Sequence, residues 1–165
     1  MKQSDWCVRE RPTSWQAQLR ADPLPWLLQA DAPGVRYLAL RDLLDLLTDD
    51  PELRAAGCAP QRPHCRHFGP HGYSDKPSGN WWKFGFPVFY VTNLLQNVEA
   101  LVALGYGHDT RLAHALDIIR AKQDTSGRWL LEYDYIGKTW VDFGPQKQPN
   151  PWVTLRALRV LKAVV

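Results

Sequence analysis

Signatures of several common enzyme chemistries are missing from this chain of 165 residues. It has no Gly-x-Ser-x-Gly nucleophile turn, no glycine-rich phosphate loop and no dinucleotide-binding fingerprint. Cysteine is scarce, and an odd count of three does not fit a secreted protein held together by disulfides. No apolar run is long enough for a transmembrane helix, and residues 1–6 lack the apolar centre of a signal peptide. We therefore expect a cytoplasmic protein without a transmembrane segment.

Strong charge of either sign is also absent. The formal net charge is +3, and the lysines and arginines are spread along the chain rather than clustered, so the sequence predicts no nucleic-acid partner. Hydrophobic residues are abundant in contrast, at 45% of the chain with eight tryptophans. This is enough for the core of one domain covering residues 1–165.

The spacing of apolar residues predicts a helical domain. Proline and asparagine or aspartate mark several helix starts, as in Asp31-Ala32-Pro33 and Asn150-Pro151, because such residues cap or begin a helix. Residues 57–87 and 130–149 lack this periodicity and are predicted to be irregular, with room for a short β-ribbon in the second stretch. The predicted helices span about 15–20, 24–29, 32–47, 50–57, 88–104, 109–123 and the chain from 150 onward.

The end of the helix over 109–123 carries the most informative pattern. Gln123 is followed by Gly127 and Trp129, in the order Gln-x3-Gly-x-Trp. Gly127 can take the positive φ of a tight turn, and Trp129 can pack its ring and indole N–H over the helix end. Gln123 can bond the backbone groups that a helix terminus leaves free.

This pattern resembles the QW motif of the squalene-cyclase and prenyltransferase family of terpenoid cyclases. Ile118 and Ile119 depart from it, since the family favours an aromatic residue and leucine just upstream of the glutamine. The resemblance covers about 24–48 and 81–162 and is best over 88–165. It implies α/α hairpin repeats, which in a chain this short form a partial arc of an α/α toroid or a compact helical bundle with long loops. The exposed apolar edges of an arc would favour a homo-oligomer.

The acid motifs of squalene-hopene cyclases and of ionisation-type terpene synthases are missing. There is neither an Asp-x-Asp-Asp sequence for protonation nor an Asp-Asp-x-x-Asp sequence for magnesium and pyrophosphate. The leading hypothesis is therefore binding of an apolar ligand, for which an isoprenoid is one candidate, or of a protein partner in an aromatic groove. The enzyme alternative is a terpenoid cyclase or prenyltransferase-type catalyst that uses an unusual acid, Asp134 or Asp142. Aromatic residues could line the binding groove or simply fill the core; they are Trp81, Trp82, Phe84, Phe86, Phe89, Tyr90, Trp140 and Phe143.

A third hypothesis is a zinc-stabilised interaction module. Cys58, Cys65, His67 and His71 offer the sulfur and nitrogen ligands that tetrahedral zinc takes. Their spacing matches no common zinc finger, and a polar loop that happens to contain histidines is the alternative interpretation. No other cofactor is required.

Overall fold

The computed structural model describes residues 15–29, 32–47, 50–56, 79–89, 91–135 and 138–165. Within these ranges β structure is limited to isolated bridges, which confirms the predicted all-α class. No helix of the described ranges is long and apolar enough to cross a bilayer. The α-helices are α1 (Leu24–Leu27), α2 (Pro33–Asp42), α3 (Pro51–Ala56), α4 (Leu94–Leu101), α5 (Ala113–Ala121) and α6 (Pro151–Ala163), and short 3-10 helices cover Gln16–Gln18, Gly79–Trp82 and Thr110–Leu112.

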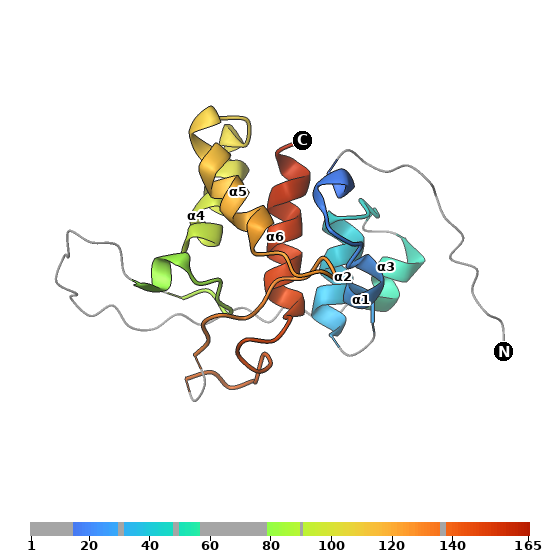
Figure 1. Ribbon diagram of the computed structural model, residues 1–165. Helices are drawn as coiled ribbons and strands as arrows, with labels where there is room; N and C mark the ends of the chain where they lie inside the picture. The colour runs from blue at the N-terminus through green and yellow to red at the C-terminus, as the bar shows by residue number, and fades with distance from the viewer. Residues whose placement is uncertain (1–14, 30–31, 48–49, 57–78, 90, 136–137) are drawn as a thin grey trace.

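Helix α6 lies in the middle of the molecule. Figure 1 shows α1, α2 and α3 on one side of it and α4 and α5 on the other, and α6 contacts α1, α2 and α4 directly. A helix enclosed in this way is buried on most of its circumference rather than along one stripe. Its buried residues are Val153, Thr154, Leu155, Arg156, Ala157, Leu158, Val160 and Leu161.

The predicted start of α6 is confirmed. The Asn150 side-chain oxygen accepts hydrogen bonds from the backbone N–H groups of Trp152 (3.0 Å) and Val153 (3.2 Å), and Pro151 occupies the first helical position. Asn150 thus pairs two of the backbone N–H groups that begin the helix, and Pro151 has no N–H that would need a partner there. The predicted helix at 50–57 is likewise present, as α3.

The predicted start of α4 at Val88 is wrong. The backbone at Asn93 is extended, with φ −130° and ψ 170°, and its side chain accepts from the N–H of Gln96 at 2.9 Å. Asn93 is thus the N-cap, and the helix begins only at Leu94. Beyond Leu101 the chain continues in a π-helical turn, Val102–Tyr106, within which Gly105 takes φ +89°.

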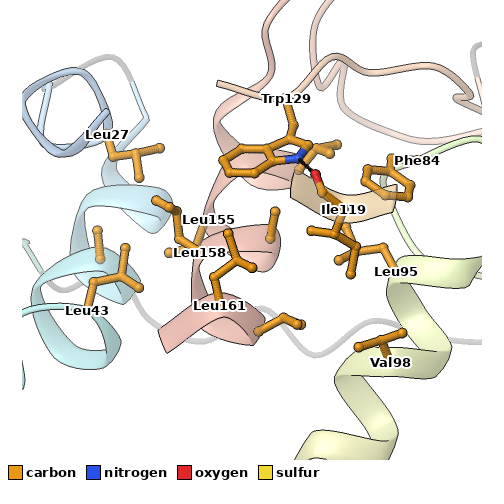
Figure 2. Packing of buried hydrophobic residues seen from close by; sticks show 14 of the residues in the cluster. Leu27, Leu43, Phe84, Leu95, Val98, Ile119, Trp129, Leu155, Leu158 and Leu161 are labelled. Carbon is orange, nitrogen blue, oxygen red and sulfur yellow. Dashed lines mark hydrogen bonds between the residues drawn. The ribbon is translucent and has the colours of Figure 1, made fainter. Parts of the chain in front are cut away.

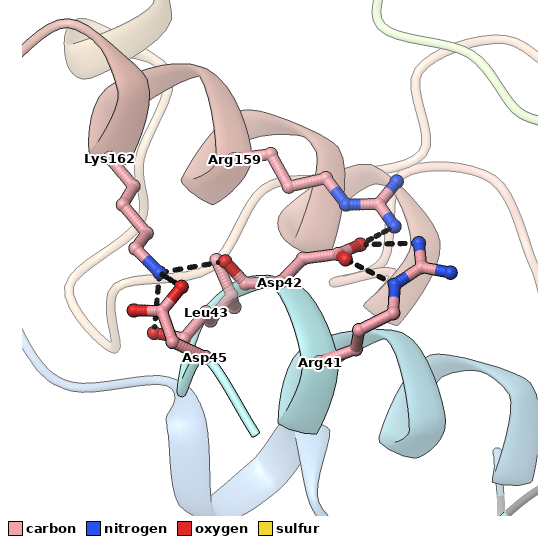
Figure 3. A network of polar contacts seen from close by, with 6 residues as sticks. All are labelled: Arg41, Asp42, Leu43, Asp45, Arg159 and Lys162. Carbon is pink, nitrogen blue, oxygen red and sulfur yellow. Dashed lines mark hydrogen bonds and ion pairs between the residues drawn. The ribbon is translucent and has the colours of Figure 1, made fainter. Parts of the chain in front are cut away.

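The predicted extension of α2 to Leu47 is also wrong. Asp45 has φ +55°, which stops the helix, and Lys162 of α6 reaches the end of α2 (Figure 3). Its ammonium group donates to the carbonyl oxygens of Asp42 (2.9 Å) and Leu43 (3.1 Å) and to the Asp45 carboxylate (2.5 Å). A cation here satisfies carbonyls that a helix end leaves unpaired.

The core joins the two sides of the molecule through α6. In Figure 2, Leu27 and Leu43 approach α6 from one side, and Leu95 and Val98 of α4 approach it from the other. The Trp129 side chain is fully buried among them. The position of this ring determines how the irregular chain after α5 reaches α6.

Candidate functional site

The turn after α5 is built by one carboxylate and one glycine. Asp124 accepts hydrogen bonds from the N–H groups of Ser126 (2.8 Å) and Arg128 (2.9 Å). Gly127 has φ +75° and lies so close to Ala21 that an added Cβ would stand 2.0 Å from the Ala21 carbonyl oxygen. Only glycine fits this backbone approach.

Gln123 holds the same turn to the chain before α1. Its buried side-chain oxygen accepts from the backbone N–H of Arg20 at 2.7 Å, and the Arg20 guanidinium donates to the Gln123 carbonyl at 2.5 Å. The bonds are reciprocal, so each residue satisfies a main-chain group of the other. This contact fixes the segment before α1 against the end of α5.

Trp129 links the end of α5 to the start of α6. Its indole N–H donates to the Ile119 carbonyl of α5 at 2.7 Å (Figure 2). Its backbone N–H donates to the Thr154 hydroxyl at 3.0 Å, and its carbonyl accepts from the Asn150 N–H at 2.9 Å. Because Trp129 is fixed to both helices, it positions both ends of the irregular stretch that follows.

Aromatic residues gather where this stretch meets the first turn of α6. The Phe86 and Trp152 rings are stacked, with centroids 4.8 Å apart and planes at 8°. The Phe143 ring meets Phe86 edge-on at 4.9 Å and Trp152 edge-on at 6.2 Å. Such pairs contribute about 0.5–1.5 kcal/mol beyond area burial, so the cluster forms a stable wall.

A first hollow of about 200 Å³ lies against this wall. It is open to solvent and combines aromatic rings with two carboxylates. Trp140 stands at it with its side chain fully exposed. The lining residues are Phe86, Pro87, Asp134, Tyr135, Thr139, Trp140, Val141, Asp142, Phe143 and Gly144.

A second hollow of about 360 Å³ lies beside the first and shares residues 142–144 with it. These residues form a ridge that two hydrogen bonds hold in place. The Asp142 carboxylate accepts from the Gly144 N–H at 2.9 Å, and the Asn150 side-chain amide donates to the Phe143 carbonyl at 2.6 Å. The lining residues are Trp26, Gln29, Ala32, Asp142, Phe143, Gly144, Pro145, Pro149, Asn150, Pro151 and Trp152.

The predicted aromatic groove is only partly assembled. Phe86, Trp140 and Phe143 line the first hollow, and Phe89 packs edge-on at 4.7 Å against Tyr135, which also lines it. Trp81, Trp82 and Phe84 line neither hollow, and Tyr90 lies outside the described residues. Phe84 is instead a buried core residue.

The two predicted acids both line the first hollow, and neither is a fully buried residue. Asp142 is exposed and Asp134 is half-buried. A third acid of the same stretch, Glu132, has a structural partner, since the Lys122 ammonium lies 2.5 and 2.6 Å from its oxygens. An acid catalyst of the proposed kind works best in a site that excludes water, and the first hollow is open.

The predicted zinc ligands Cys58, Cys65, His67 and His71 lie outside the described residues. Among the residues that the structure does describe, no three His, Cys, Asp or Glu side chains are grouped so as to hold a metal ion.

Sequence reasoning missed Trp26, Tyr135 and Trp152 as site residues. Trp152 was expected only as part of the last helix, yet its ring is shared by the aromatic wall and the second hollow. The available signal was its place in the first turn of a capped helix, where a side chain points back toward the preceding loop.

Carboxylates with lowered pKa values lie away from both hollows. Hydrogen bonds from Arg111 lower the pKa of half-buried Asp109 to about 2. Burial raises the pKa of Asp42, but hydrogen bonds and charge attraction from Arg41 and Arg159 outweigh it and lower the pKa below 3.8. These groups belong to ion pairs, which also perturb pKa values without catalysis.

No protein-family model, no curated protein and no solved structure matches this chain. The functional argument therefore rests on the geometry of the two hollows.

Proposed function

We propose that the protein binds an apolar small molecule in the first hollow, against the indole ring of Trp140. The observation that carries the proposal is the full exposure of this ring beside an aromatic wall. If a ligand covers about half of an indole's roughly 200 Å², it removes about 100 Å² from water and contributes about 2.5 kcal/mol. The wall of Phe86 and Phe143 supplies further apolar area.

The shape of the site favours a narrow ligand. A hollow of about 200 Å³ is small for a drug-sized molecule, which usually occupies about 300–1,000 Å³. A slender chain can lie over the ridge of residues 142–144 and extend into the second hollow. The resemblance to squalene cyclases extends the proposal to isoprenoid chains, which are slender and branched.

Binding rather than catalysis is proposed because the first hollow is open to solvent and neither of its two acids is a fully buried residue. Asp142 is exposed and accepts the Gly144 N–H, as a carboxylate in a solvated turn does. The first hollow is itself open to solvent, so it does not exclude water from a reacting group.

The test is a titration with Nile red, a neutral apolar dye whose fluorescence rises in apolar sites. We expect saturable binding that weakens by about sixtyfold in Trp140→Ala, because that variant loses about 2.5 kcal/mol of apolar burial. Trp82→Ala is the matched control, because Trp82 is 46% exposed and lines neither hollow. Farnesol should compete with the dye if the site accepts isoprenoid chains.

Equal Nile red affinities in Trp140→Ala and Trp82→Ala would refute the proposal. Native mass spectrometry of the full chain, with and without a chelator, tests the remaining hypotheses in one experiment. It reports the number of subunits, any zinc lost to the chelator and the mass of any retained ligand.

A further inference from the structure

We propose that the ligand of the first hollow carries a positive charge, as a trimethylammonium or similar alkylammonium group attached to an apolar chain. This inference rests on the proposed function, since it names the chemical class of the molecule that lies against Trp140. It comes from the charges and rings that line the two hollows.

The charge of the site is opposite to that of the chain. Asp134 and Asp142 line the first hollow and Asp142 also lines the second, whereas no Lys, Arg or His is among the described residues that line either. The chain as a whole has a formal net charge of +3. A concave surface lined by charges of one sign concentrates ions of the other sign.

Some carboxylates of the described part are neutralised by basic side chains, and others, such as Asp124, accept only backbone N–H groups. Glu132 pairs with Lys122, and Glu99 pairs with Arg156 at 2.7 Å. Within the described ranges no basic side chain forms an ion pair with Asp142, which accepts a hydrogen bond from the Gly144 N–H. A carboxylate can accept several further contacts, so Asp142 can also contact a cationic ligand.

The aromatic lining favours a particular kind of cation. Trp140, Tyr135 and Phe143 line the same hollow as the two acids. The face of an aromatic ring attracts a cation within about 6 Å of its centroid, and tryptophan does so best. A trimethylammonium group is bulky and cannot donate hydrogen bonds, so it fits an apolar, aromatic site better than a primary ammonium.

A matched pair of probes tests the charge alone. Choline and 3,3-dimethylbutan-1-ol have the same shape, and only choline is charged. We expect choline to bind the full chain about tenfold more tightly in a calorimetric titration, and added salt to weaken choline binding only. Trp140→Ala should weaken the binding of both probes.

The variant Asp142→Asn tests whether the Asp142 charge causes the preference for choline over the uncharged alcohol. Asparagine keeps the side-chain oxygen that accepts the Gly144 N–H, so the ridge is preserved while one charge is lost. We expect a fall of about threefold to tenfold in choline affinity and none for the alcohol. Asp117→Asn is the control, because it removes an exposed carboxylate of α5 that lines neither hollow.

Different outcomes refute the proposal of a cationic ligand and the proposal of an apolar binding site. Equal affinities for the two probes, no saturable choline binding, or equal effects of Asp142→Asn and Asp117→Asn would overturn the cation assignment. If Nile red binding still depends on Trp140 in that case, the proposed apolar site stands. If it does not, both proposals are refuted.

Discussion

At the scale of single residues, exposure separates the roles of two tryptophans. Trp129 is fully buried and donates to Ile119, so Trp129→Ala leaves a cavity and an unsatisfied carbonyl. We expect a loss of about 3–5 kcal/mol in the free energy of unfolding. Trp140→Ala should change it by less than about 0.5 kcal/mol. Chemical denaturation measures both, and similar losses would contradict this division of roles.

Two glycines allow backbone strain to be separated from steric contact. Gly127 and Gly105 both have positive φ, but a Cβ on Gly127 would clash with Ala21, whereas a Cβ on Gly105 would meet nothing within 4 Å. Gly105→Ala should therefore cost about 1 kcal/mol from strain alone, and Gly127→Ala about 3 kcal/mol or more. Equal midpoints of thermal unfolding would show that the approach to Ala21 relaxes cheaply.

At the scale of elements, the sequence predicted the helix ends that depend on neighbouring residues. The cap at Asn150 and the short helix after Asp50 follow from neighbouring residues, so both were predictable. The end of α2 was not, because Lys162 supplies its contacts from the far end of the chain. Periodicity alone extended that helix to Leu47, since leucines continue past the point where the backbone turns.

The sequence also predicted part of the candidate site. The irregular stretch with Trp140 and Phe143 was singled out by its aromatics, and both line the first hollow. Composition could not distinguish these residues from Phe84, which tertiary packing buries instead. Trp152 was missed because helical periodicity assigns residues to a helix but does not show what its first turn contacts.

Asn150 connects the last helix to the ridge between the hollows, and two substitutions separate its functions. Asn150→Ala removes the cap of α6 and the bond to the Phe143 carbonyl, and should cost about 1–2 kcal/mol. Asn150→Asp keeps the oxygen that caps α6 but loses the amide N–H, so only the hydrogen bond to the Phe143 carbonyl of the ridge is removed. We expect Asn150→Asp to be nearly as stable as the natural chain while binding Nile red more weakly. Unchanged Nile red affinity would show that the ridge does not shape the site.

At the scale of the whole molecule, α6 joins the two sides by charge as well as by apolar packing. Arg156 is buried and reaches toward α4, where it pairs with Glu99. Arg159 and Lys162 reach toward α2, where Arg159 pairs with Asp42 and Lys162 with Asp45 (Figure 3). The basic side chains of one helix thus fix the position of both sides, which makes the arrangement sensitive to the charge of their partners.

Low pH should weaken the contact between α6 and α2, because it protonates Asp42, the partner of Arg159. Its pKa is lowered in the fold: burial alone would raise it, but Arg41 and Arg159 favour the charged form more strongly. A carboxyl group with a lowered folded pKa contributes stability that is present above its unfolded pKa, near 3.8, and lost as the pH falls through the folded value. Stability should therefore decline below pH 3.8 as Asp42 takes up a proton.

Asp42→Asn measures this contribution, because asparagine resembles the protonated acid and cannot pair with the two arginines. At neutral pH the variant should be less stable by about 1 kcal/mol, since the pair is only partly shielded from water. As the pH falls below 3.8 the natural chain should lose this advantage and the two unfolding curves should converge. A difference that stays constant with pH would mean that Asp42 acts through shape rather than charge. Added salt should narrow the gap at neutral pH, because screening weakens a partly exposed pair and leaves packing unchanged.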